Sequence, residues 1–209
     1  GIRLLVKAEC LQHTGSFKLR GASNAVWSLD DTVKHVVAFS SGNHAQGVAR
    51  AAASRGLQAT IVMPKDSPAG KIEGTKAYGG TVILYDRYTE SREEIGADLA
   101  TRKQAHLIKP FDDFRVIAGQ GTVGLEIATQ AAAKNLTPDA IMCCCGGGGL
   151  IAGMSIAASD MIPGVDIWAA EPEFYDDTRR SLASGKIETA DITMPSICDS
   201  IVTAQPGEI

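Results

Sequence analysis

One lysine near the start of the chain lies where a lysine could do chemistry. Lys18 falls in the segment 13–22, HTGSFKLRGA, between a glycine-marked turn and a helix-forming stretch. The apolar run 4–9, LLVKAE, predicts a short strand just before it, so Lys18 is expected at a strand-to-helix corner, where clefts lie in α/β sheets. A desolvated lysine loses its proton readily and can form a Schiff base with a carbonyl compound. Most lysines are only solvated surface groups, so this role depends on a partner site elsewhere.

A run of four glycines could be that partner site. Gly146, Gly147, Gly148 and Gly149 lie between a predicted strand at 140–145 and a predicted helix that runs to about Met161. The amides of such a loop and the N-terminus of the helix can bind a phosphate. A Schiff-base lysine and a phosphate loop are the two features that anchor pyridoxal phosphate, but the spacing does not identify which phosphate compound binds. A tight turn is the plainer interpretation of the glycines, although four of them carry a large entropic cost on folding.

The same loop also permits a dinucleotide. Gly147-x-Gly149-x-x-Ala152 satisfies a loose dinucleotide-binding pattern, and Glu171 follows the next predicted strand at a distance suited to a ribose. An NAD(P)-binding oxidoreductase therefore stays open on this spacing.

A third loop carries hydroxyl and amide groups. The segment 40–44, SSGNH, follows the predicted strand 35–40 and begins a helix. Hydroxyls, an amide side chain and helix-start N–H groups suit a carboxylate, whereas the alternative is an ordinary serine N-cap.

Composition excludes several classes of protein. The 209 residues are 44% hydrophobic and 21% charged with a net charge of −4, which predicts a globular protein without a nucleic-acid or membrane partner. The five cysteines, three of them consecutive at 143–145, form no CxxC pair and favour a reducing cytoplasm. No export leader is expected, because the chain starts at Gly1 without a charged and then apolar segment. The uncharged segment 140–158 is interrupted by the glycines and is not expected to span a membrane.

The chain alternates predicted strands and helices, which indicates α/β architecture with mostly parallel sheets covered by helices on both faces. Strands are expected at 35–40, 58–63, 81–84, 140–145 and 165–170, and helices at 45–55, 69–78, 88–103, 123–134 and from the glycine loop to 161. The glycines of 119–121 are expected in a loop that leads into the helix 123–134. The segment 109–113, KPFDD, breaks the rhythm and predicts a domain crossing. Residues 1–34 and 110–209 are assigned to a large cofactor-binding domain and residues 35–109 to a small domain.

Four motifs together resemble the serine/threonine dehydratases, a group of pyridoxal-phosphate enzymes that includes serine racemase and shares the fold of the tryptophan synthase β-subunit. They are SFKLRGA at 16–22, SSGNHAQG at 40–47, IAGQGT at 117–122 and GGGGL at 146–150. The resemblance implies fold type II for these enzymes, with a chain truncated at both ends. Relatives continue past Ile209, and the later segment carries the residue that contacts the pyridine nitrogen. A fragment of low stability and weak activity, or an inactive remnant, is therefore a further alternative.

The resemblance also implies roles for single residues. Lys18 would form the Schiff base, Phe17 would lie beside the cofactor ring, Asn43 would contact the ring hydroxyl, and Gly146, Gly147, Gly148 and Gly149 would hold the phosphate. The substrate carboxylate would bind at Ser41, Gly42, Asn43 and His44. Mg²⁺ or Ca²⁺ would bind at Glu171, the Tyr175 carbonyl and Asp177, since oxygen ligands suit these ions, although an ordinary solvated acidic loop is the alternative.

The implied activity is the dehydration of L-threonine or L-serine to a 2-oxo acid and ammonia by a homodimer. A lysine amine would remove the α-proton. Ser41, on the substrate face opposite the lysine, would return a proton from that side, so serine racemase activity stays an alternative, as does hydroxyaspartate dehydratase activity.

Overall fold

The computed structural model describes all 209 residues, and the chain forms two compact units, Gly1–Pro110 and Phe111–Ile209. They are called the first and second unit below, and each is described by itself.

The first unit is built on a parallel sheet of four strands in the order β3-β2-β1-β4. The strands are β1 (His35–Phe39), β2 (Gln58–Pro64), β3 (Gly80–Tyr85) and β4 (His106–Leu107). The central pair β1 and β2 is a nearly continuous run of buried apolar residues, as expected for a parallel sheet covered on both faces. Val37 pairs with Thr60 in this register.

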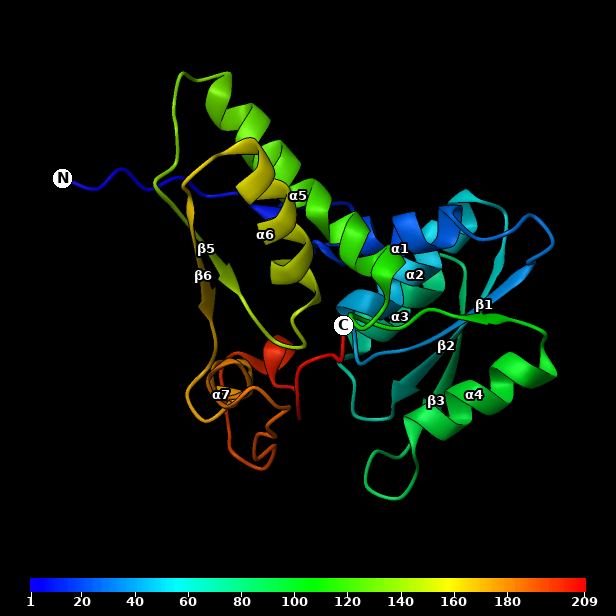
Figure 1. Ribbon diagram of the computed structural model, residues 1–209. Coiled ribbons are helices and arrows are strands. Elements are labelled where there is room, and N and C mark those ends of the chain that lie inside the picture. The colour runs from blue at the N-terminus through cyan, green and yellow to red at the C-terminus, as the bar shows by residue number, and fades with distance from the viewer. The chain divides into compact units, whose positions relative to one another are not determined.

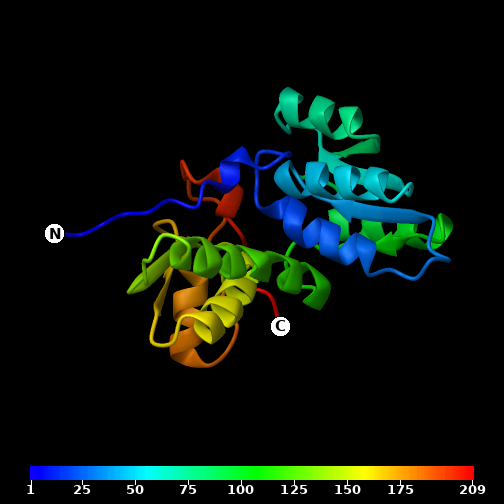
Figure 2. The same ribbon diagram turned by 90° about the horizontal axis from the view of Figure 1, so that it is seen from above.

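Helices cover both faces of this sheet (Figures 1 and 2). Three of them, α1 (Lys18–Trp27), α2 (Asn43–Ser54) and α3 (Ala69–Ala77), lie side by side on one face, and α4 (Arg92–Arg102) covers the other. Four of the five alanines of α2 are buried, so this helix lies close to the strands. On the face covered by α4, Phe39 and Val62 of the sheet and Leu99 of α4 belong to one hydrophobic cluster.

The second unit contains a two-stranded parallel sheet, β5 (Ala140–Cys144) and β6 (Asp166–Ala170). The helices α5 (Phe114–Ala132) and α6 (Gly149–Met161) pack against each other (Figure 1), and α7 (Asp177–Ser184) follows β6. Ile141 and Met154 belong to the core between this sheet and the helices. Short 3₁₀ turns lie at Glu9–Leu11 and Asp199–Ile201.

Glycines allow α5 and α6 to approach closely. A Cβ at Gly153 would lie 2.1 Å from the carbonyl oxygen of Ile117, and one at Gly124 would lie 2.5 Å from that of Met154. Gly119 and Gly121 lie inside α5, so the prediction of a loop at 119–121 is wrong. Helix α5 begins earlier because Asp113 caps it, accepting from the amide of Arg115 at 2.7 Å.

Two other predicted elements differ. Residues 1–8 form no strand, since none of the sheets pairs with them, and Leu4 is 82% exposed. The helix expected over 88–103 begins only at Arg92, because Ser91 caps it by accepting from the amide of Glu94 at 3.2 Å.

The α/β fold class with parallel sheets is confirmed, and no helix combines the length and apolar character needed to cross a bilayer. The boundary between the two units falls at Pro110, within the predicted crossing at 109–113. Residues 1–34 belong to the first unit here because α1 packs on α2. Their assignment to a large cofactor-binding domain stays a prediction.

Candidate functional site

The loop that precedes Lys18 and α1 is anchored at two points. Thr14 and Ser16 are buried, and the Ser16 hydroxyl accepts from the Lys18 amide at 3.2 Å. The hydroxyl of Tyr78, which follows α3, donates to the carbonyl of His13 at 2.7 Å. Lys18 is therefore the first residue of a helix whose preceding loop is anchored to the rest of the first unit.

Close packing of α1 on α2 positions Lys18. A Cβ at Gly47 would lie 3.2 Å from the Lys18 carbonyl carbon and oxygen, so this glycine lets the two helices touch at Lys18. The half-buried ammonium donates to the Pro110 carbonyl at 2.7 Å and lies 5.3 Å from the centre of the Phe17 ring. Lys18 is thus held in place rather than solvated along its whole length.

The serine loop leaves donors available at the start of α2. Gly42 is the N-cap residue, and it offers no side-chain cap to the first turn. Its own amide donates to the Ser40 hydroxyl at 3.1 Å. The side chains of exposed Ser41 and half-buried Asn43 form no hydrogen bond within the chain. First-turn amides and two polar side chains can therefore serve a carboxylate or another anion.

His44 turns its ring away from this role. The ring is 2% exposed, and its Nε2 is 3.0 Å from the carbonyl oxygen of Ile108, which makes Nε2 the protonated nitrogen of the neutral ring. Burial, and then the charge of Lys18, lowers the pKa of His44 to about 3, although the bond to Ile108 acts in the opposite direction. Nδ1 has no partner and can only accept. His44 can therefore offer an anion its backbone amide, and not an imidazolium.

The glycine loop combines close packing with an uncapped helix. A Cβ at Gly147 would lie 2.5 Å from the Phe111 ring, which leaves no room for a side chain, and one at Gly146 would lie 3.2 Å from Ile201, a tight contact. Gly148, with φ of 88°, is the N-cap of α6, and no side chain caps the amides that follow. The amides of this loop and a helix N-terminus without a side-chain cap suit the phosphate of pyridoxal phosphate. In the first unit, the half-buried amine of Lys18 by itself suits a Schiff base with an aldehyde.

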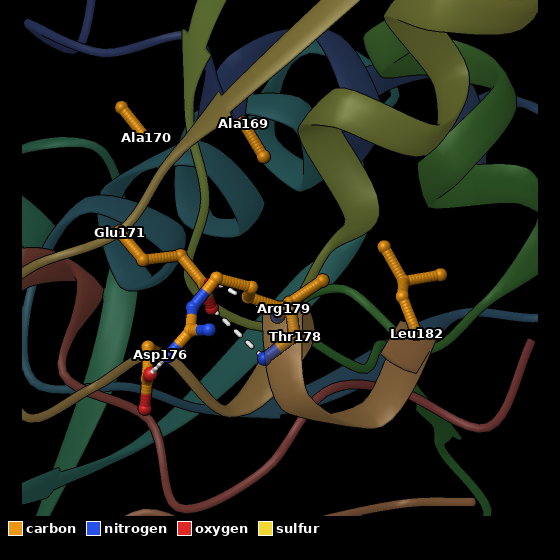
Figure 3. Close-up of a pocket in the computed structure, with 7 residues that line it drawn as sticks. All are labelled: Ala169, Ala170, Glu171, Asp176, Thr178, Arg179 and Leu182. Carbon is orange, nitrogen blue, oxygen red and sulfur yellow. Dashed lines mark hydrogen bonds and ion pairs between the residues drawn. The ribbon is translucent and has the colours of Figure 1, made fainter. Parts of the chain in front are cut away.

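The acidic segment after β6 holds two carboxylates in different environments. Glu171 accepts from the amides of Thr178 at 2.9 Å and Arg179 at 3.0 Å, so it caps α7 (Figure 3). Asp177 is 1% exposed, its Oδ2 has no partner, and burial raises its pKa, with a further contribution from Glu171. The Tyr175 hydroxyl donates to the Met194 carbonyl at 2.6 Å.

An open cavity of about 400 Å³ lies beside this segment (Figure 3). Its lining includes Glu171 but neither Tyr175 nor Asp177; the residues are Ala169, Ala170, Glu171, Asp176, Thr178, Arg179 and Leu182. No group of three or more histidine, cysteine, aspartate or glutamate side chains forms a metal centre, and all five cysteines are free thiols. A cation at the acidic segment would therefore need the backbone carbonyl as a ligand.

The first unit brings together Phe17, Lys18, Asn43 and His44, and the second contains the glycine loop and the acidic segment. Sequence reasoning missed three contributors. The carbonyl of Pro110, and Lys71, whose side chain lies against Gly42, depend on long-range contacts that no local pattern reveals. Gly47 belonged to a recognised motif, and its spacing one helical turn after Asn43 was the available signal for a helix contact.

Comparison with known proteins defines the class. The family model described as "Pyridoxal-phosphate dependent enzyme" matches residues 1–209. The chain is 44% identical over 198 residues to a serine racemase of Oryza sativa subsp. indica, covering 94% of this chain and 56% of the relative. It is 44% identical over 210 residues to an L-threo-3-hydroxyaspartate ammonia-lyase of Saccharomyces cerevisiae, covering 100% of this chain and 63% of the relative.

The crystal structure of a threonine deaminase from T.th. has a similar fold. It superposes with a TM-score of 0.92 at 44% identity, covering 99% of this chain and 66% of that one. The chain belongs to the pyridoxal-phosphate dependent enzyme family. These relatives confirm the predicted resemblance to the serine/threonine dehydratase group. The chain spans less than two thirds of the length of each of them.

Proposed function

We propose that the protein carrying this chain is a pyridoxal-phosphate dependent dehydratase that converts L-threonine or L-serine to a 2-oxo acid and ammonia. The observation that carries the proposal is Lys18, a half-buried amine held at the start of α1 by the close contact at Gly47. Family membership supports the cofactor, and the names of the relatives support a β-hydroxy amino acid as substrate. The same family does not favour the NAD(P) alternative.

In this proposal each group has one task. Pyridoxal phosphate supplies an electron sink for the charge that develops when the α-proton leaves. Gly146 to Gly149 and the first amides of α6 hold its phosphate, while Phe17 and Asn43 contact its ring. The α2 N-terminus binds the substrate carboxylate, and the Lys18 amine takes the α-proton.

Ser41 supports a second candidate activity, racemisation of serine. Its hydroxyl is exposed and forms no bond within the chain, so it is free to hand a proton to a substrate. Relatives from rice and from Arabidopsis thaliana are named serine racemase. Hydroxyaspartate dehydration stays open on the same basis, since other relatives are named for that reaction.

The acidic segment supports a structural cation. We propose that Mg²⁺ or Ca²⁺ binds Glu171, the Tyr175 carbonyl and Asp177, because Asp177 holds a buried carboxylate oxygen without a partner. The homodimer and the cytoplasmic location inferred from the sequence stay predictions, and sedimentation of the purified protein tests the first.

The first experiment is the visible absorption spectrum of the chain with added pyridoxal phosphate, before and after borohydride. We expect a band that borohydride abolishes, with the reduced cofactor attached to Lys18 in peptide mapping. Lys18→Ala should lose both signals, whereas Lys34→Ala, which removes an exposed lysine that donates to the Asp31 carbonyl, should keep them.

Product analysis then separates the activities. With L-serine, release of a 2-oxo acid supports dehydration, and appearance of D-serine supports racemisation. Attachment at another lysine, or no attachment at all, would contradict the proposed site.

A further inference from the structure

A lysine that no motif contains lies against the start of α2. A Cβ added at Gly42 would lie 2.3 Å from Lys71 Cδ and 2.9 Å from Lys71 Nζ. The absence of a side chain at Gly42 therefore leaves the space that the end of Lys71 occupies. The ammonium of α3 is in this way brought to the N-cap of α2.

A second contact of the same kind fixes the position. A Cβ at Gly74 would lie 2.9 Å from Gln46 Oε1. The side chain of Gln46 in α2 therefore packs over Gly74 of α3, in the same way that the side chain of Lys71 in α3 packs over Gly42, the N-cap of α2. Gln46 and Gly42 are one helical turn apart, and so are Gly74 and Lys71. The two helices thus pack reciprocally, and this packing places the end of Lys71 beside the N-cap of α2.

The charge at this place has no counter-ion. Lys71 is half-buried, and its ammonium forms no ion pair or hydrogen bond within the chain, unlike Lys76 on the same helix, which pairs with Glu73 at 2.9 Å. A partly desolvated ammonium beside helix N-terminal amides makes a strongly favourable position for an anion.

We propose that Lys71 is a substrate-binding residue, whose ammonium binds a carboxylate together with the first amides of α2. The inference rests on the proposed function in taking this anion to be the carboxylate of the amino-acid substrate. It extends the proposed function by naming a positive charge for the substrate carboxylate. The His44 ring is neutral and supplies none, whereas the Lys71 ammonium does. The site therefore selects a ligand with a carboxylate at the α2 N-terminus by charge as well as by hydrogen bonds.

The test is calorimetric titration of the full chain with succinate, with and without saturating pyridoxal phosphate to fill the cofactor phosphate site. Lys71→Met keeps the apolar stem over Gly42 and removes the charge, so it should fold and bind succinate at least tenfold more weakly. Lys71→Arg should stay within threefold of the parent. The matched control Lys76→Met removes an exposed charge from the same helix and should change nothing.

A second variant tests the geometry without touching the charge. Gly42→Ala should displace the end of Lys71 and weaken succinate binding in the same direction. Added NaCl should weaken binding by the parent chain and have a smaller effect on Lys71→Met.

The outcomes separate this inference from the proposed function. Equal succinate affinity of the parent chain and Lys71→Met, or no succinate binding by the parent chain, would overturn the role of Lys71. Lys71-dependent binding without cofactor attachment at Lys18 would instead uphold the anion site and contradict the enzyme.

Discussion

The ring of His44 links the proposed substrate loop to the stability of the first unit. Its folded pKa of about 3 lies below the usual 6.5 of a free histidine, because the ring is buried and Lys18 is near. Between these values the unfolded chain binds a proton that the folded chain does not. The contribution of His44 to stability is therefore complete above pH 6.5 and is lost as the pH falls toward 3, by up to about 1.4 kcal/mol per pH unit.

We expect His44→Gln to remove this dependence, because glutamine can still donate to the Ile108 carbonyl but does not titrate. Denaturant unfolding of both chains at pH 7.5 and pH 5 measures the difference, in a range where most carboxylates stay ionised. The parent should lose about 1 kcal/mol or more relative to the variant over this interval. His35, whose pKa burial also lowers, is present in both chains and cancels. Parallel pH profiles would show that His44 is protonated in the folded state.

The glycines Gly124 and Gly153 of the second unit allow close contact between α5 and α6. Gly153 and Gly124 have no positive φ, so their function is space and not backbone conformation. Gly153→Ala would place a methyl group 2.1 Å from the Ile117 carbonyl and 2.8 Å from the Gly121 amide, both backbone atoms of α5. Neither can rotate away, so the helices must separate. We expect a loss of about 3 kcal/mol in the free energy of unfolding.

Gly70→Ala is the matched control for this change. Gly70 is also helical, in α3, and an added Cβ meets nothing within 4 Å. It should gain about 0.5 to 1 kcal/mol, since alanine is the better helix former. The unfolding temperatures of the two variants should therefore shift in opposite directions from that of the parent. An unchanged unfolding temperature for Gly153→Ala would show that α5 and α6 are not in close contact.

The helices and strands could be predicted from the sequence only in part, and the glycines of α5 show why. The strands at 35–40, 58–63 and 140–145 were predictable, because buried apolar runs bounded by glycine or proline have a local cause. Gly119 and Gly121 were misplaced in a loop, because a glycine marks a turn and a helix crossing equally well. The strand expected at 4–9 failed for a related reason, since an apolar run becomes a strand only where a neighbour pairs with it.

For the candidate site, residue types were predictable and their environments were not. The resemblance indicated Lys18, Asn43 and the glycine loop, and the comparisons confirm the family that these motifs define. The buried ring of His44, the Pro110 carbonyl and Lys71 depend on atoms distant in the chain. Their roles follow only from three-dimensional contacts.

The two units of the chain differ in how well their sheets are protected. The central strands of the first unit are buried on both faces, whereas the cross-strand pair Met142 and Trp168 of the second unit is 76% and 58% exposed. A two-stranded sheet with an exposed face opens easily. In this chain we therefore expect backbone amides of β5 and β6 to exchange with solvent faster than those of β1 and β2.

A bound cation should change this difference in one unit only. If Ca²⁺ or Mg²⁺ joins Glu171 to Asp177, it connects the end of β6 to the start of α7 and stabilises the folded state by mass action. Hydrogen exchange followed by mass spectrometry should then slow in β6 and α7 when Ca²⁺ is added, and stay unchanged in the first unit. Asp177→Asn should abolish the slowing. Asp160→Asn, which removes the same charge at an exposed position of α6, should retain it. Equal exchange rates with Ca²⁺, with Mg²⁺ and with a chelator would show that no cation binds the acidic segment. Glu171 would then serve only as the cap of α7, and the buried Asp177 oxygen would have only a packing role.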